Sequence, residues 1–153
     1  MNIQDIVVGS LCSWREARGG GQTGMQSIFN VLQNRATKRN TDVYTEATRF
    51  EQFSSMTAPG DPELGVWPNT AHQVDYQAWE IALNLAQTAA NGGLTDLTKG
   101  ATLYYAPHGL TPDEISPTRY ALPDGTLVSF PKSWNRDVVK YTVTIADQLF
   151  FTE

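Results

Sequence analysis

The spacing of the apolar residues changes near residue 100 of this 153-residue chain, and that change limits the fold more than any other feature. Up to about residue 90 they recur every three or four positions, which is the period of an amphipathic helix. Beyond residue 100, short runs of β-branched and aromatic residues stand between turn-forming residues, which is typical of strands. The pattern predicts an α+β fold, with a helical body and a small antiparallel β region.

Local signals set the expected bounds of the first two helices. The apolar spacing predicts a first helix over residues 3–17, and Gly19–Gly21 ends it. Thr23-x-x-Gln26 has the form of a capping box, so a second helix is expected to begin there. It is expected to end near Lys38-Arg39, because cations suit the negative end of the helix dipole.

The middle of the chain predicts one further long helix after a mostly irregular stretch over residues 40–69, where a short helix near 43–47 is a candidate. Thr70-x-x-Gln73 has the form of another capping box, and Gly92-Gly93 supplies a stop. The buried face of this helix is expected to contain Val74, Ala78, Ile81, Leu85 and Ala89.

The last third of the chain predicts strands. Residues 120–122 and 127–130 flank Pro123-Asp124-Gly125-Thr126, a hairpin turn. The other expected strands cover residues 101–105, 138–145 and 149–151.

Composition excludes several classes of protein. The chain has 11 Lys and Arg against 16 Asp and Glu. Its net charge of −5 therefore argues against a protein that binds duplex DNA. One cysteine and two distant histidines predict no intrachain disulfide and no metal site, and we expect no cofactor. No apolar run approaches the roughly 20 residues that span a bilayer, and the first residues lack the basic stretch of a secretion signal. We expect a single domain over residues 1–153, which is long enough to bury one core, and we expect it to be made in the cytoplasm.

Glu16 is the first candidate for chemistry. It lies at the end of the first expected helix, beside the glycine turn and between Arg15 and Arg18. A surface glutamate in a local ion pair is one interpretation. The other is a general acid, which requires that burial and the negative end of the helix dipole favour the protonated carboxyl more than the two arginines disfavour it.

Four aromatic residues form the second candidate group, because flat rings stack on the apolar faces of sugars while their polar ends bind hydroxyl groups. The alternative is packing in the core or at its rim. The group consists of Trp67, Tyr104, Tyr105 and Trp134. Cys12, among apolar residues, is expected to be a buried and inert thiol.

Five segments, in order, resemble the SleB-type cell-wall hydrolases, the family of spore-cortex-lytic enzymes and their phage relatives. Trp14-Arg15-Glu16-Ala17-Arg18-Gly19 resembles the family's E-[AS]-R-G segment, and a helix ending Leu32-Gln33-Asn34-Arg35 follows it. The other matches are Phe50-Glu51-Gln52-Phe53-Ser54, Gly100-Ala101-Thr102-Leu103-Tyr104-Tyr105-Ala106-Pro107, and Trp134 with the ending 144–151.

The resemblance implies a compact lysozyme-like domain that cleaves peptidoglycan between N-acetylmuramic acid and N-acetylglucosamine. The family's catalytic glutamate corresponds to Glu16, and Gln52 and Ser54 would line the groove with the aromatic residues. Many members are lytic transglycosylases, in which the sugar's own 6-hydroxyl replaces water and one carboxyl suffices. A hydrolase would need a second carboxylate. The candidates are Glu51, Asp61, Glu63 and Asp75.

The chain departs from the family pattern at several positions, and these concern the far wall of the groove. Gly20 stands where an acidic residue is common, Gln148 replaces a histidine, and Ala146 replaces a glycine. The segment 108–132 is longer than expected at this place.

We expect a monomeric phage endolysin or virion-associated lysin that acts at the bacterial wall, with no nucleic-acid partner and no membrane insertion. The alternative is a non-catalytic glycan-binding or structural phage module with the same fold.

Overall fold

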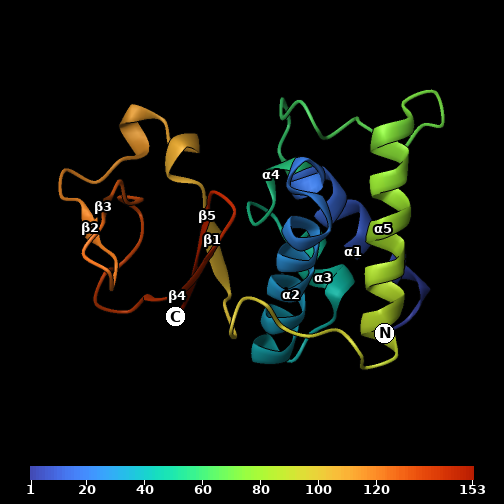
Figure 1. The fold of residues 1–153 in the computed structure, drawn as a ribbon, viewed down its shortest axis with the longest axis horizontal. Helices are drawn as coiled ribbons and strands as arrows, with labels where there is room; N and C mark the ends of the chain where they lie inside the picture. Colours follow the sequence, from blue (N-terminus) through green and yellow to red (C-terminus); the bar gives the residue numbers. More distant parts are fainter. The chain divides into compact units, whose positions relative to one another are not determined.

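The computed structural model describes residues 1–153 and divides into two compact units, Met1–Leu97 and Thr98–Glu153 (Figure 1). The first unit is helical and the second contains all the strands. This confirms the α+β class. The lysozyme-like arrangement and the single catalytic domain stay predictions. None of the helices combines the length and apolar character needed to cross a bilayer.

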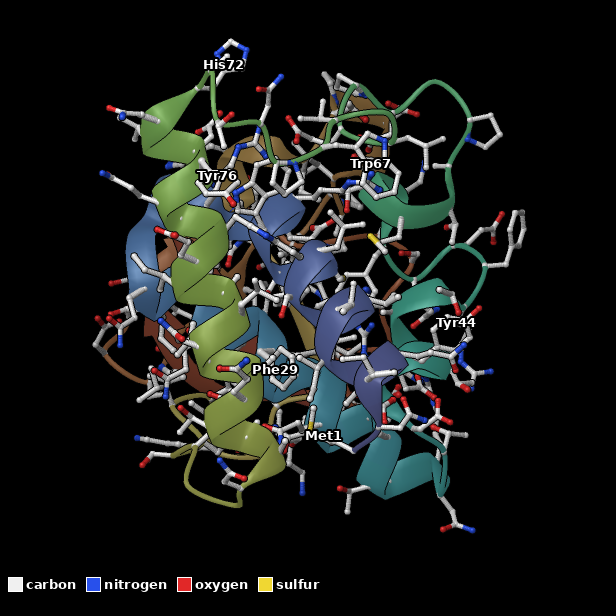
Figure 2. All side chains as sticks on the ribbon, turned by 90° about the vertical axis from the view of Figure 1, so that its right-hand side faces the viewer. Met1, Phe29, Tyr44, Trp67, His72 and Tyr76 are labelled. Atoms are coloured by element: carbon white, nitrogen blue, oxygen red, sulfur yellow. The ribbon has the colours of Figure 1, made fainter.

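The helical unit is built around α1 (Ile3–Ala17), which contacts α2 (Gly21–Arg39), α3 (Val43–Thr48) and α5 (Gln73–Ala90). Figure 2 shows α1 between α5 and α3. The short α4 (Ser54–Thr57) also contacts α1. The largest fully buried side chains of this unit include Trp14, Met25, Ile28, Phe29, Leu32 and Phe53.

The bounds of α1 match the prediction, and a reciprocal cap fixes its start. Asn2 Oδ1 accepts the N–H of Asp5 at 2.9 Å, and Asp5 Oδ2 accepts the N–H of Asn2 at 2.8 Å. The capping box predicted at Thr23 is wrong, because α2 begins at Gly21 with no side-chain cap. Gly21 has a φ of 67°, a conformation that glycine adopts freely, so the chain turns directly into the new helix.

The start and the buried face of α5 also differ from the prediction. The helix begins at Gln73, not at the predicted Thr70, and its cap residue His72 makes no capping hydrogen bond. Val74 is 79% exposed, because the core contacts of α5 come from its later turns. The buried residues of the helix are Ala82, Leu85, Ala86 and Ala89.

A buried carboxylate ties α3 to the end of α2. Glu46 is fully buried and accepts hydrogen bonds from Arg39 at 2.5 Å, Arg49 at 2.8 Å and Thr41 at 2.7 Å. Burial raises the pKa of Glu46, but the hydrogen bonds from Arg49, Thr41 and Arg39 outweigh it and lower the pKa to about 2. The charge is therefore compensated inside the fold.

The second unit contains an antiparallel sheet in the order β1-β5-β4, formed by β1 (Leu103–Tyr105), β4 (Lys140–Ile145) and β5 (Gln148–Thr152). A separate hairpin pairs β2 (Tyr120–Ala121) with β3 (Leu127–Val128). The predicted strands and hairpin are confirmed. β5 is longer than the predicted strand at residues 149–151, and the other four strands are shorter than predicted.

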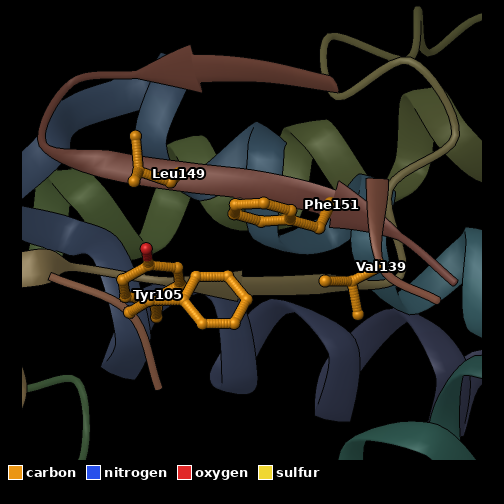
Figure 3. Packing of buried hydrophobic residues seen from close by; sticks show 5 residues of the cluster. Tyr105, Val139, Leu149 and Phe151 are labelled. Atoms are coloured by element: carbon orange, nitrogen blue, oxygen red, sulfur yellow. The ribbon is translucent and has the colours of Figure 1, made fainter. Parts of the chain in front are cut away.

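Aromatic rings dominate the core of the second unit. Figure 3 shows Tyr105, Val139, Leu149 and Phe151 in this core. Tyr105 stacks on Phe151 with ring centroids 5.8 Å apart, and Phe130 meets Phe151 edge to face at 6.0 Å. Such pairs add to the stabilisation from burial alone.

Candidate functional site

A cavity of about 470 Å³ lies in the helical unit at the C-terminal end of α1. We call it the Glu16 cavity. Figure 2 shows Trp67, His72 and Tyr76 at one end of this unit, with Met1 toward the other. The cavity is lined by Arg15, Glu16, Arg18, Gly19, Glu63, Val74, Asp75 and Ala78.

Ser55 orients the carboxyl of Glu16. Its hydroxyl donates to Glu16 Oε1 at 2.5 Å, and the serine is 3% exposed. A hydrogen bond to a carboxylate is stronger than one between neutral groups, so this contact restrains the glutamate at the cavity wall. Ser54, the groove residue predicted from the sequence, is the exposed first residue of α4, and the contact of its neighbour Ser55 was not predicted.

Arg18 holds the two other carboxylates of the Glu16 cavity. Its guanidinium donates to both oxygens of Glu63, at 2.5 and 3.0 Å, and its Nε lies 3.5 Å from Asp75 Oδ1. The hydrogen bonds to Glu63 raise the pKa of Arg18. The guanidinium also lies 4.4 Å from the ring centre of Trp14, so packing and charge fix it together.

Arg15 is more deeply buried than Arg18, with 6% of its surface exposed. Its Nε donates to the carbonyl oxygen of Val66 at 3.0 Å, and Nη1 donates to that of Ser55 at 3.1 Å. The indole of Trp67 lies against the guanidinium, 4.8 Å from ring centre to Cζ. The one sequence-predicted sugar platform in this unit, Trp67, is 65% exposed.

The nominated second carboxylates fall into two groups. Glu63 and Asp75 line the Glu16 cavity, where Arg18 engages both. Asp61 instead accepts the N–H of Glu63 at 2.8 Å and shapes the turn. Glu51 is exposed, with a φ of 61°, in the turn before α4. Gln52 is half-buried in the same turn.

The other predicted aromatics come together in the second unit, where Tyr104, Tyr105 and Trp134 help to line a cavity of about 270 Å³. Tyr105 is 7% exposed, and its hydroxyl donates to the carbonyl oxygen of Ser129 at 2.8 Å. Burial raises the pKa of Tyr105 to about 12. Trp134 meets Tyr105 edge to face at 5.2 Å. The roles of these residues in sugar binding stay predictions.

No family model, curated protein or solved structure matches this chain.

Proposed function

We propose that this protein cleaves the glycan strands of peptidoglycan between N-acetylmuramic acid and N-acetylglucosamine, with Glu16 as the catalytic acid and then base. The observation that carries the proposal is the placement of Glu16 in the wall of a cavity of about 470 Å³, oriented by the Ser55 hydroxyl. The resemblance of five ordered segments to the SleB-type hydrolases supports the same residue.

In the proposed reaction, protonated Glu16 donates its proton to the glycosidic oxygen as the bond from the muramoyl C1 breaks. The N-acetylglucosamine unit then leaves with a free 4-hydroxyl group. The 6-hydroxyl of the muramoyl unit forms the new bond to C1 and returns a proton to the carboxylate. The products are a 1,6-anhydro-muramoyl end and a regenerated acid, so one carboxyl serves both steps.

The ion pairs of the cavity favour transglycosylation over hydrolysis. A retaining or inverting hydrolase uses a second carboxylate as nucleophile or base. Glu63 and Asp75 are the nominees that share the cavity with Glu16, and Arg18 contacts both. Because Arg18 contacts both carboxylates, they are less available to attack the sugar or to activate a water, so Glu16 is left to act as both acid and base.

We further propose that the protein acts at the bacterial wall as a phage endolysin or virion-associated lysin. The proposed substrate-binding residues of the helical unit are Gln52, Ser54 and Trp67, and those of the second unit are Tyr104 and Trp134, while the buried Tyr105 supports that cavity from the core. The test is the fall in turbidity of a peptidoglycan suspension on adding purified protein.

Glu16→Gln should lower the clearing rate by about 10³-fold, because it removes the proton donor and keeps the side chain's shape. Glu80→Gln is the matched control, an exposed glutamate on α5. Clearing by Glu16→Gln at the native rate would contradict the mechanism. A native protein that binds peptidoglycan without clearing it would indicate the non-catalytic module instead.

A further inference from the structure

The two arginines of the Glu16 cavity differ in what compensates their charge. Arg18 is bound to Glu63 and also contacts Asp75. Arg15 donates hydrogen bonds to neutral acceptors, which are the carbonyl oxygens of Val66 and Ser55 and the sulfur of Met56 at 3.7 Å. Its Nη2 is buried and has no hydrogen-bond partner.

This arrangement is costly for a guanidinium that is 6% exposed. Arginine keeps its charge in proteins, and a buried charge destabilises the fold unless it is paired. Burial lowers the pKa of Arg15, and the more distant charges of Glu63 and Asp61 offset that effect only in part. The wall of the Glu16 cavity thus contains a cation whose charge and hydrogen-bonding capacity are not fully used.

We propose that Arg15 binds a carboxylate of the sugar unit that enters the Glu16 cavity. This inference rests on the proposed glycan cleavage. N-Acetylmuramic acid carries a carboxylate on its lactyl group. Where a peptide is joined to that group by an amide bond, the carboxylates are those of the peptide, whereas N-acetylglucosamine has none. A guanidinium and a carboxylate form charge-assisted hydrogen bonds, so Arg15 makes the cavity selective for the acidic sugar.

Trp67 lies beside this cation. Its indole packs against the guanidinium and is 65% exposed, so a sugar can contact the ring. A sugar that packs on the indole or displaces it brings its carboxylate to Arg15. The same pair of side chains then provides an apolar platform and an anion contact for one sugar ring.

The test is a titration of the intact protein, followed by NMR, with N-acetylglucosamine, N-acetylmuramic acid and N-acetylmuramoyl dipeptide at constant salt. We expect at least one acidic sugar to bind about tenfold more tightly than N-acetylglucosamine, the effect of one hydrogen bond between charged groups. Tighter binding of N-acetylmuramic acid assigns the lactyl carboxylate, and tighter binding of the dipeptide alone assigns the peptide. Equal affinity for all three ligands would overturn the proposal.

Arg15→Met should abolish the difference between acidic and neutral sugars, while Arg119→Met, at an exposed position of the second unit, should leave it unchanged. Retained selectivity in a folded Arg15→Met protein would overturn the assignment to Arg15. If that variant does not fold, Arg15→Lys and the methyl ester of N-acetylmuramic acid replace it. The lysine should weaken the selectivity and the neutral ester should lose it in the native protein, and the opposite results would overturn the proposal.

The binding role of Arg15 and the catalytic role of Glu16 can fail separately. Glycan cleavage by a protein without preference for acidic sugars would overturn the role of Arg15 and leave Glu16 as the catalytic residue. Selective binding of acidic sugars without cleavage would support the role of Arg15 and remove the catalytic proposal.

Discussion

The two units of this protein use different interactions to organise their interiors. In the helical unit, charged side chains are built into the fold, as in the contact of buried Glu46 with Arg49 and the contact of Arg18 with Glu63. In the second unit, aromatic rings packed around Phe151 dominate the interior, and Tyr105 contributes both a ring and a satisfied hydroxyl. Acid–base chemistry therefore has its candidates in the helical unit, while the second unit is shaped for packing.

The difference between the two interiors also separates aromatic residues that the sequence placed in one group of candidates for sugar binding. Trp67 was predicted to be a sugar platform, and Tyr105 was predicted to line the groove. Trp67 is 65% exposed beside a buried guanidinium, and Tyr105 is 7% exposed within an aromatic core. An aromatic residue near an irregular segment thus indicates a platform only when its surroundings leave a face of the ring accessible.

The largest expected effect comes from removing the central ring of the second unit. Phe151→Ala should lower the free energy of unfolding of that unit by about 4 kcal/mol, because it deletes a fully buried ring and leaves a cavity. Hydrogen exchange resolved by peptide should show lost protection within residues 98–153. Leu127→Ala, at a 57% exposed position in the same unit, is the control and should change protection little. Equal effects of the two changes would contradict the account of this core.

A smaller effect is expected from protonating Glu46 in the helical unit. The pKa of this carboxyl is about 2 against an ordinary value of 4.5, so the folded state binds its proton more weakly than the unfolded state. The stabilisation is present above pH 4.5 and is lost as the pH falls toward 2, up to about 3 kcal/mol. Urea unfolding between pH 6 and pH 2 measures it. Glu46→Gln should flatten this pH dependence, and an unchanged profile in that variant would refute the assignment.

The smallest expected effect compares two adjacent serines of α4. Ser55→Ala should lower kcat/KM on peptidoglycan by about tenfold, because Glu16 loses the hydroxyl that orients it. Ser54→Ala should leave kcat/KM near the native value, since Ser54 is exposed. A larger loss from Ser54→Ala than from Ser55→Ala would favour the groove residue predicted from the sequence.

Local signals predicted much of the fold. The apolar period gave the bounds of α1, and the turn at residues 123–126 gave the hairpin of β2 and β3. The two Thr-x-x-Gln patterns failed because the same letters occur where no cap forms, at Thr23 inside α2 and at Thr70 before α5.

The site was predicted only in part, because its contacts join distant positions. Glu16 was found from its place at a helix end, but Ser55 lies 39 residues further along the chain and carries no local signal for the contact. The burial of Arg15 depends on Val66 and Trp67, about 50 residues away, so no window of sequence around the arginine reveals it.

The most direct test of the proposed mechanism is mass spectrometry of the muropeptides released from purified peptidoglycan, with Glu16→Gln alongside. We expect 1,6-anhydro-muramoyl ends from the native protein and no glycan products from the variant. Reducing muramoyl ends would contradict the single-carboxyl mechanism and direct attention to Glu63 and Asp75. The absence of glycan products from the native protein would contradict the proposed function itself.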